Sequence, residues 1–161
     1  MPHIDRTNPY AAFNFILKGA SDPSLTAAFM EVSGLDGENA LIEYREGSDQ
    51  QGQNAGNFVR KQPGLERYPN VTFRRGITGN LLLWQGRKRI RDATSYPGQL
   101  NYVKRDFVVE LQDEQHKTVL RWILRNGWVV KLSGPSLNAK SNEIAIESIE
   151  LACERIEIDD T

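Results

Sequence analysis

The side chains that could act as nucleophiles or general bases are few, and their spacing does not assemble a catalytic group. The two imidazoles belong to His3 and to His116, which stands beside Glu114 and Lys117. A catalytic histidine needs a nucleophile on one side and an orienting carboxylate on the other. Neither neighbourhood supplies both, so we expect two solvated histidines.

The only cysteine, Cys153, cannot form a disulfide framework or a zinc cluster by itself. It stands in an alternating apolar run, which indicates a buried structural thiol. The sequence contains no phosphate-binding Gly-x-x-x-x-Gly-Lys-Ser/Thr run, no Gly-x-Ser-x-Gly turn and no His/Cys spacing suited to a metal. One series of carboxylates is expected to form a solvated face along the last strand: Glu147, Glu150, Glu154 and Glu157. We therefore predict a protein that is not an enzyme and binds no cofactor.

Composition narrows the classes of partner. The 161 residues suit a single domain, and their 20 basic and 21 acidic side chains leave a formal charge of -1. No overall field therefore draws the protein to nucleic acid or to an anionic membrane. No stretch approaches the roughly 18 apolar residues of a membrane helix, and the N-terminus has no apolar signal segment. We expect a subunit that is made in a cytosol, does not insert into a membrane and begins with a flexible leader, 1–9.

Strands must position the polar groups, because apolar and polar residues alternate along most of the chain. The predicted strands are 13–18, 27–35, 40–46, 71–75, 107–112, 120–125, 128–132 and 144–158. Residues 60–69 are rich in turn formers. The one predicted helix covers 80–91, with Thr78 as its N-cap.

Basic residues gather at the C-terminal end of the predicted helix: Arg87, Lys88, Arg89 and Arg91. The helix dipole favours cations there, which explains the cluster without any partner. The alternative interpretation is a patch that faces an acidic neighbour. Nucleic-acid binding through this cluster and Arg74-Arg75 is disfavoured by the balanced total charge.

The final predicted strand changes phase twice. Its apolar residues occupy even positions through Ile146, odd positions from Ile149 to Cys153, and even positions again from Ile156. Because a slip of one residue moves every side chain to the opposite face, each change implies a bulge or a passage between sheets. Such bending strands are typical of barrels and sandwiches.

A polar segment from Gly47 to Gln62, rich in Gln, Asn and Gly, interrupts the strand pattern. An excursion of this length inside a compact domain is usually either functional or disordered. We interpret it as an arm that becomes ordered on a partner. Uncovered strand edges are an aggregation liability unless they are paired, and pairing with copies of the same chain uses them. The pattern therefore indicates a self-assembling structural protein.

A family resemblance rests on six segments in chain order: Ser33-Gly34-Leu35, Ile42-Glu43-Tyr44-Arg45-Glu46-Gly47, Lys61-Gln62-Pro63-Gly64-Leu65, Val71-Thr72-Phe73-Arg74-Arg75-Gly76-Ile77-Thr78-Gly79, Arg125-Asn126-Gly127-Trp128 and Gly134-Pro135-Ser136-Leu137-Asn138-Ala139-Lys140-Ser141-Asn142-Glu143-Ile144-Ala145-Ile146-Glu147. With these segments the chain resembles the tail tube proteins of contractile-tailed bacteriophages and their relatives in extracellular contractile injection systems. The resemblance covers nearly the whole chain, from Asn8 to Glu157.

The resemblance implies a mainly β fold, in which two packed antiparallel sheets form a small barrel with one flanking α-helix. Tube proteins of this kind are similar to the type VI secretion tube protein, form hexameric rings and stack the rings into a hollow tube inside a sheath. The implied partners are copies of the chain itself, the sheath protein, the baseplate or spike, and the tube terminator. The lumen would pass DNA or a protein effector. Assembly in the bacterial cytoplasm would yield a virion tail or an extracellular injection particle.

The resemblance also implies roles for individual residues within a single tail-tube domain, 1–161. The arm, 47–60, would reach the adjoining ring through Asp49, Gln50, Gln51, Gln53, Asn54, Asn57, Phe58 and Arg60. This arm is longer than the commonest form in the family. The implied subunit contacts are Glu43, Tyr44, Arg45, Arg74 and Arg75. Helix residues Leu81 and Trp84 would anchor the helix to the barrel. Alternating polar positions suggest four lumen residues: Glu110, Gln112, Arg121 and Arg125.

Three alternatives stay open at the level of sequence. A tube initiator or baseplate adaptor of the same machine would bind a tube ring on one side only, so purified protein would not stack without limit. A monomeric β-barrel module for an oligonucleotide or a polysaccharide would stay monomeric and bind its ligand. An enzyme is the least favoured alternative, because the sequence contains only two histidines and one cysteine.

Overall fold

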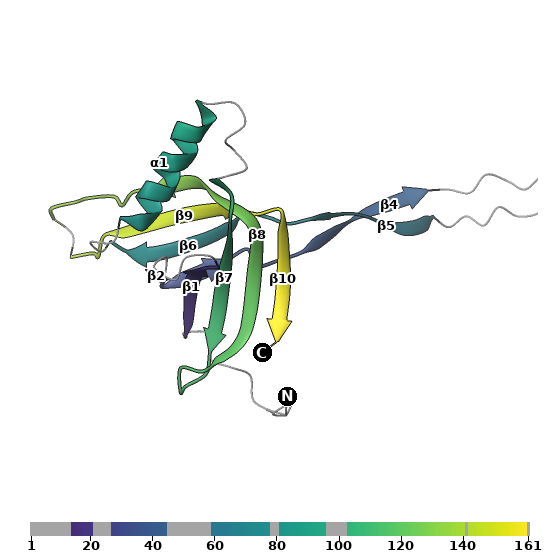
Figure 1. The fold of residues 1–161 in the computed structure, drawn as a ribbon, viewed down its shortest axis with the longest axis horizontal. Coiled ribbons are helices and arrows are strands. Elements are labelled where there is room, and N and C mark those ends of the chain that lie inside the picture. The colour runs from purple at the N-terminus through teal and green to yellow at the C-terminus, as the bar shows by residue number, and fades with distance from the viewer. Residues whose placement is uncertain are drawn as a thin grey trace, which may run out of the picture.

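The computed structural model describes residues 14–20, 27–44, 59–77, 81–95, 103–140 and 142–160. Within these ranges the chain forms antiparallel strands and the helix α1 (Leu82–Thr94) (Figure 1). The strands are β1 (Phe15–Gly19), β2 (Ala27–Ala28), β3 (Glu31–Ser33), β4 (Glu38–Tyr44), β5 (Arg60–Arg67), β6 (Val71–Gly76), β7 (Arg105–Gln112), β8 (Thr118–Ser133), β9 (Ile146–Ala152) and β10 (Arg155–Asp160).

The long strand β8 organises the body, because its two halves pair with different neighbours. The first half pairs with β7 on one side and β10 on the other, as in the pairing of Arg125 with Arg155. The second half pairs with β9, beginning at Trp128 opposite Ala152. The path of paired strands runs β2-β1-β7-β8-β9-β6-β3, with β10 beside β8. Two antiparallel sheets therefore share one bent strand, which curves visibly in Figure 1.

The two strands at the ends of this path, β2 and β3, are consecutive in the sequence. β2 ends at Ala28 and β3 begins at Glu31, so only Phe29 and Met30 separate them. The Met30 N–H donates to the carbonyl oxygen of Arg74 at 2.8 Å, beside the β3–β6 pairing. Among the described residues no ladder joins β2 to β3. The predicted fold of two packed antiparallel sheets with a flanking helix is confirmed, and the barrel stays open at this seam.

The core lies between the two sheets, and both contribute to it. Its most deeply buried apolar side chains come from β1, β6, β7, β8 and β9: Leu17, Val71, Phe73, Val109, Leu124, Ile149 and Leu151. Phe29 packs from the seam onto Phe73, with 5.1 Å between the ring centroids. Tilted aromatic pairs of this kind add stability beyond the area that they bury. Phe29, in the segment that joins β2 to β3, is therefore part of the core.

The two phase changes in the final strand have different causes. At the second change the chain passes from one sheet to the other, as predicted. β9 pairs with the second half of β8 and ends at Ala152, and β10 begins at Arg155 and pairs with the first half of β8. The first is not a bulge. β9 alternates without interruption from Ile146, and Glu147 takes a core-facing position in line with Ile149.

Several predicted element boundaries need correction. Residues 120–125 and 128–132 belong to one strand, β8, and residues 144–158 form two strands, β9 and β10. Residues 27–35 form two strands instead of one, because the chain crosses between sheets at Phe29 and Met30. Residues 60–69, predicted as turns, contain β5; Pro63 is tolerated because a two-stranded hairpin leaves one edge of each strand unpaired. The helix ends three residues later than predicted, at Thr94. It has no side-chain cap at Leu81, and the predicted cap, Thr78, lies outside the described residues.

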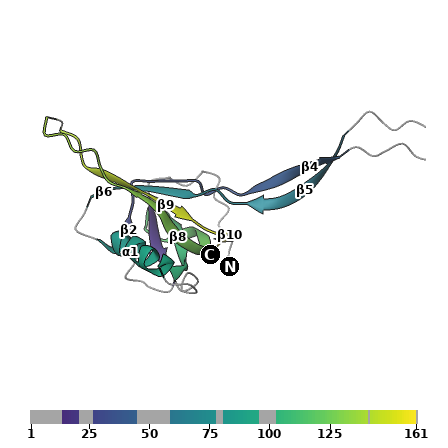
Figure 2. The same ribbon diagram turned by 90° about the horizontal axis from the view of Figure 1, so that it is seen from above.

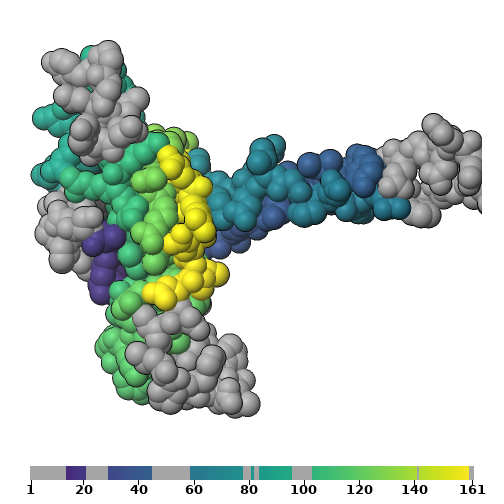
Figure 3. All heavy atoms as spheres, turned by 45° about the vertical axis from the view of Figure 1, so that its right-hand side comes forward, coloured from purple at the N-terminus to yellow at the C-terminus, as the bar shows by residue number. Residues whose placement is uncertain are grey.

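Two segments project from the body in opposite directions. β4 and β5 leave it as a hairpin at one end of the long axis, whereas the connection between β8 and β9 projects from the other end (Figures 1 and 2). In the space-filling view the hairpin stands clear of the body (Figure 3). Both ends are therefore accessible to other molecules.

Candidate assembly surfaces

The β4–β5 hairpin exposes apolar side chains on both of its faces. Successive residues of a strand point to opposite faces, so Leu41 and Ile42 lie on different sides, and they are 59% and 50% exposed. Leu65 on β5 is 80% exposed. The register places Glu43 opposite Lys61, whose ammonium lies 3.7 Å from the carboxylate. A two-stranded hairpin is marginally stable in water, so this segment is suited to packing against another surface.

The predicted subunit contacts fall into three groups. Glu43 and Tyr44 are exposed on β4, and Arg74 is exposed on β6, where it forms an ion pair with Glu31 at 3.1 Å. Arg75 is only 4% exposed, so the structure corrects its assignment to the surface. Arg45 lies outside the described residues.

Most of the predicted arm also lies outside the described residues, namely Asp49, Gln50, Gln51, Gln53, Asn54, Asn57 and Phe58. Arg60 is described, and it is the exposed first residue of β5. The arm therefore connects the far ends of β4 and β5, so the described hairpin is its base.

Arg75 forms a buried ion pair that the sequence did not reveal. Arg75 on β6 lies directly opposite Glu147 on β9, and its Nε donates to the Glu147 carboxylate. Glu147 is 3% exposed, which corrects its assignment to a solvated face. The Arg75 guanidinium also lies 5.8 Å from the ring centroid of Phe29. The one signal in the sequence was the phase change before Ile149, where a glutamate occupies an inward position.

The helix is anchored by residues other than the predicted ones. Leu81 and Trp84 are 59% and 46% exposed, whereas Ala93 is buried and Ile90 packs against the core. The contact between α1 and the body is therefore made by the C-terminal half of the helix, and the prediction of Leu81 and Trp84 as its anchor is corrected. A hydrogen bond also connects α1 to β8, because Arg87 Nη1 donates to the carbonyl oxygen of Val130 at 3.0 Å.

Leu81 and Trp84 instead border a groove between α1 and β8. The groove has a volume of about 590 Å³ and is lined by Leu81, Trp84, Gln85, Arg87, Lys88, Ile90, Arg91, Trp128, Val129 and Val130. Its lining is mostly apolar, and three of the four basic residues predicted at the helix end, Arg87, Lys88 and Arg91, contribute to it.

One predicted lumen residue, Glu110, is buried. It is 5% exposed and accepts hydrogen bonds from Lys18 Nζ at 2.7 Å, Thr118 Oγ1 at 3.1 Å and Arg121 Nε at 3.2 Å. Burial raises the pKa of Glu110, but the hydrogen bonds from Lys18 and Thr118 outweigh it and leave the pKa lowered. The structure thus corrects Glu110 from a lumen contact to the centre of a charge cluster. Gln112 is partly exposed.

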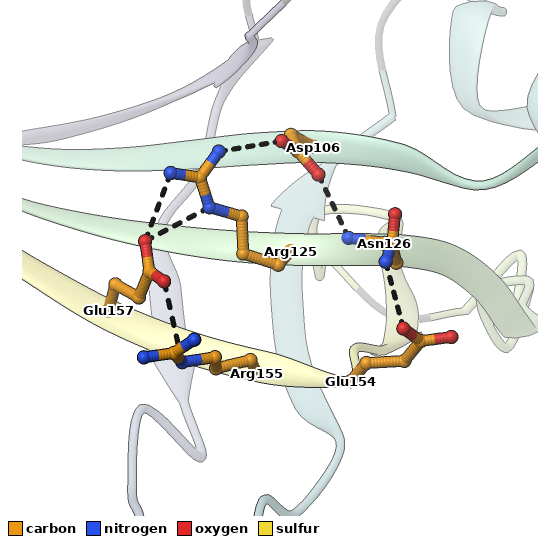
Figure 4. Close-up of polar contacts among 6 residues, drawn as sticks. All are labelled: Asp106, Arg125, Asn126, Glu154, Arg155 and Glu157. Carbon is orange, nitrogen blue, oxygen red and sulfur yellow. Dashed lines mark hydrogen bonds and ion pairs between the residues drawn. The ribbon is translucent and has the colours of Figure 1, made fainter.

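The remaining lumen candidate, Arg125, ties three strands together (Figure 4). From β8 it donates to Asp106 on β7 at 2.8 Å and to Glu157 on β10 at 3.0 Å. Glu157 also lies 3.4 Å from Arg155 Nε. Opposite charges on neighbouring strands stabilise a sheet through such cross-strand contacts. These contacts lie near the point where the pairing partners of β8 change from β7 and β10 to β9.

The next residue, Asn126, holds the bend of β8. Its φ is 51°, a conformation that asparagine tolerates better than most residues. Its backbone N–H donates to Asp106 at 2.9 Å, and its side-chain amide donates to Glu154 at 2.8 Å (Figure 4). The hydrogen bonds from Asn126 and then from Arg125 lower the pKa of Asp106.

Replacement of Asp106 by asparagine is expected to lower the free energy of unfolding by about 1–2 kcal/mol at pH 7, because a charge-assisted hydrogen bond is lost. A carboxylate whose pKa is lowered by folding stabilises the protein above its unfolded pKa and loses this effect as pH falls through the folded pKa. The deficit of the variant should therefore shrink below about pH 4. Urea unfolding of the unassembled wild-type and variant subunits from pH 3 to 7 measures this difference in the free energy of unfolding.

Asp159→Asn, at an exposed carboxylate on β10, is the matched control and should leave stability nearly unchanged. An equal deficit for Asp106→Asn at every pH would show that its charge is irrelevant.

Cys153 packs partly against the core, as predicted, and burial raises the pKa of its thiol. His116 has a φ of 61° and lies in the turn between β7 and β8, which agrees with a turn residue. In the described part of the chain, no group of His, Cys, Asp and Glu is arranged to hold a metal ion. The described helix is too short and too polar to cross a membrane.

Comparison with known proteins identifies the family. Residues 11–157 match the family model described as T4-like virus tail tube protein gp19. This chain belongs to that family. The family resemblance seen in the sequence is thereby confirmed, and no curated protein matches the chain.

Solved structures of injection systems share the fold of this tail tube family member. A chain of the anti-feeding prophage cap, the AFP tube terminating cap, is 28% identical with a TM-score of 0.79, and the match covers 98% of this chain and 95% of that one. A chain of the PVC sheath–tube complex, from an extracellular contractile injection system in its extended state, is 30% identical with a TM-score of 0.74. The match covers 96% of this chain and 94% of that one.

A more distant likeness concerns the fold alone. Hcp1 from Flavobacterium johnsoniae is 14% identical with a TM-score of 0.54, over 91% of this chain and 95% of that one. Family and neighbours together make this chain a structural subunit of a tube in a phage tail or an extracellular injection particle.

Proposed function

We propose that the chain forms homohexameric rings that stack into the hollow inner tube of a contractile tail or injection system. The observation that supports this function is the β4–β5 hairpin, which stands clear of the body (Figure 3). Its side chains Leu41, Ile42 and Leu65 are exposed. A hairpin of this kind gains stability when another molecule covers it. Copies of the same chain provide that cover in every ring.

The residues divide between two roles in this proposal. The arm, 47–60, continues the hairpin and reaches the adjoining ring, with Glu43, Tyr44, Arg45 and Arg74 contributing to subunit contacts. Gln112, Arg121 and Arg125 remain candidates for the lumen, through which DNA or a protein effector passes. The role of the subunit is mechanical and involves no catalysis, because the tube must survive the thrust of the surrounding sheath.

The proposed partners are the sheath outside the tube, the baseplate or spike at one end and a terminator at the other. The neighbours support this set, since they include a sheath–tube complex and a tube terminating cap. The subunit is made and assembled in the bacterial cytoplasm before the particle is released. The chain forms a single tail-tube domain.

Negative-stain electron microscopy of the purified protein, with sedimentation over a range of concentrations, tests the proposal. We expect six-fold rings that stack into hollow tubes as the concentration rises. A protein that stays monomeric at every concentration, or rings of another symmetry, would contradict it.

A second candidate is a tube end protein, such as a cap, terminator or initiator, of the same machine. The observation in its favour is the likeness to a chain of the AFP tube terminating cap structure, with a TM-score of 0.79. An end protein presents one face to the tube and must not continue it. Single or paired rings that never lengthen would favour this candidate over a main tube subunit.

A further inference from the structure

The second half of β8 has one open edge, and that edge faces α1. β7 pairs with β8 only as far as Gly127, and β10 pairs with it only as far as Arg125. From Trp128 to Ser133, β8 pairs with β9 on one side, and no described strand pairs with its other side. The carbonyl oxygen of Val130 accepts a hydrogen bond from Arg87 of α1 at 3.0 Å. An open edge presents backbone groups that can pair with another chain.

The groove of about 590 Å³ lies between α1 and this edge. Along α1 it is lined by Leu81, Trp84, Lys88 and Arg91, which follow one another at intervals of three or four residues and therefore share one face. Val130 contributes to the lining from β8. A volume of this size is typical of ligand sites. The groove thus combines side chains of a helix with the backbone of a strand.

Apolar and charged side chains are separated along the groove. Leu81 and Trp84 are exposed at the N-terminal end of α1, whereas Lys88 and Arg91 are exposed nearer its C-terminal end. None of the described residues that line the groove is acidic. Arg91 lies 3.4 Å from Asp92, but an ion pair between two exposed side chains is weak. The groove therefore complements a ligand with apolar groups at one end and carboxylates at the other.

We propose that this groove binds an extended, acidic peptide segment of another protein, which adds to the open edge of β8 as a further strand. The peptide backbone pairs with residues 128–133. Apolar side chains of the peptide cover Leu81 and Trp84, and its carboxylates meet Lys88 and Arg91. Strand addition of this kind draws affinity from main-chain hydrogen bonds and specificity from side-chain contacts. The site lies within one subunit, so it does not depend on the proposed stacking of rings.

Arg87 favours an acidic peptide over a neutral one. In the subunit its guanidinium donates to the carbonyl oxygen of Val130. A peptide N–H that pairs with this oxygen releases the guanidinium to a peptide carboxylate. A hydrogen bond between two charged groups is stronger than one to a neutral carbonyl, so this exchange stabilises the complex. A nucleic acid would meet the same cations but has no strand backbone to pair with the edge.

Binding of defined peptides to the unassembled subunit tests the proposal, measured by fluorescence anisotropy. The probe is a short, labelled peptide of alternating valine and glutamate. We expect saturable binding that weakens as salt is raised, because the charged contacts are exposed. A peptide of alternating valine and lysine should bind about tenfold more weakly, a difference that corresponds to about 1.4 kcal/mol.

Two modified probes test the backbone pairing. One is N-methylated at every valine and the other at every glutamate. Only one set of these N–H groups faces β8, because the backbone groups of successive residues in a strand point to opposite edges. One modified probe should therefore lose most of the binding, whereas the other should bind nearly as tightly as the unmodified peptide.

Charge reversal on α1 locates the site. Lys88→Glu combined with Arg91→Glu should weaken binding of the glutamate probe by about tenfold, and this variant should bind the lysine peptide instead. Arg89→Glu is the matched control, because Arg89 is exposed on the same helix but does not line the groove. It should bind the glutamate probe nearly as tightly as the wild type.

Four results would overturn the proposal. Absence of saturable binding would show that the groove takes no such peptide. Equal effects of the two N-methylations would show that the open edge of β8 is not used. Equal losses in the control and the double variant would reduce the binding to general charge attraction. Tighter binding of a single-stranded oligonucleotide than of the probe would assign the cations to a different ligand.

Discussion

Replacement of Glu147 by alanine is expected to lower the free energy of unfolding by about 3–5 kcal/mol, because it removes the carboxylate that faces the buried Arg75 guanidinium. Arg75 and Glu147 are 4% and 3% exposed and face each other directly across β6 and β9. The Arg75 guanidinium lies 5.8 Å from the ring centroid of Phe29, which belongs to the core. Urea unfolding of the unassembled subunit, below the concentration at which rings form, measures the loss.

The double variant Arg75→Met with Glu147→Leu is the control for this effect. It removes both charges and fills the space with apolar side chains, a change that is often neutral or stabilising. The single variant should therefore be much less stable than the double variant. If both lose the same amount, the cost comes from altered packing around β6 and β9 and the ion pair itself contributes little.

The strands were predictable because their signal is local. Alternation along β1, β6, β7 and β8 is visible in any short window of sequence, and the structure places the core residues Leu17, Phe73, Val109 and Leu124 as that alternation requires. β5 was missed because its residues, including Pro63 and Gly64, read as turn formers. Its strand conformation comes from pairing with β4, and pairing between segments is a tertiary effect.

The polar contacts were harder to predict, since they depend on partners far along the chain. The family resemblance implies a surface position for Arg75, and the series of carboxylates predicts a solvated face for Glu147, whereas buried Arg and Glu occur mainly when they are paired. Their pairing follows from the register of β6 with β9, which no short motif encodes. Glu110 is a similar case, because Lys18 reaches it from β1 across the sheet. The family resemblance, by contrast, rests on ordered segments and could be recognised from sequence alone.

Replacement of Gly34 by alanine is expected to be the other severe change. Gly34 has a φ of +87°, and a Cβ at this position would lie 2.5 Å from the carbonyl oxygen of Asn70. The left-handed conformation costs an L-residue about 1–2 kcal/mol, and crowding against backbone costs about 1–3 kcal/mol more. Urea unfolding of the unassembled subunit should therefore show a loss of about 2–5 kcal/mol.

Gly86→Ala is the matched control for this prediction. Gly86 lies inside α1, and a Cβ there would meet nothing within 4 Å. Alanine is the better helix former by about 0.5–1 kcal/mol, so the control should be neutral or slightly more stable. Equal behaviour of the two variants would show that the Gly34 conformation relaxes at little cost.

The position of Gly34 also connects stability with assembly. It follows β3 directly, and the four residues from Gly34 to Gly37 lead the chain from the core into the hairpin. Leu35 packs partly against the core, which fixes the direction in which the hairpin leaves the body. A backbone that shifts to relieve the contact with Asn70 would redirect β4, and a small rotation at the base moves the far end of a long hairpin through a large distance. We therefore expect Gly34→Ala subunits that still fold to stack poorly, as judged by tube length in electron micrographs; normal tubes from this variant would show that the hairpin finds its partner without a fixed base.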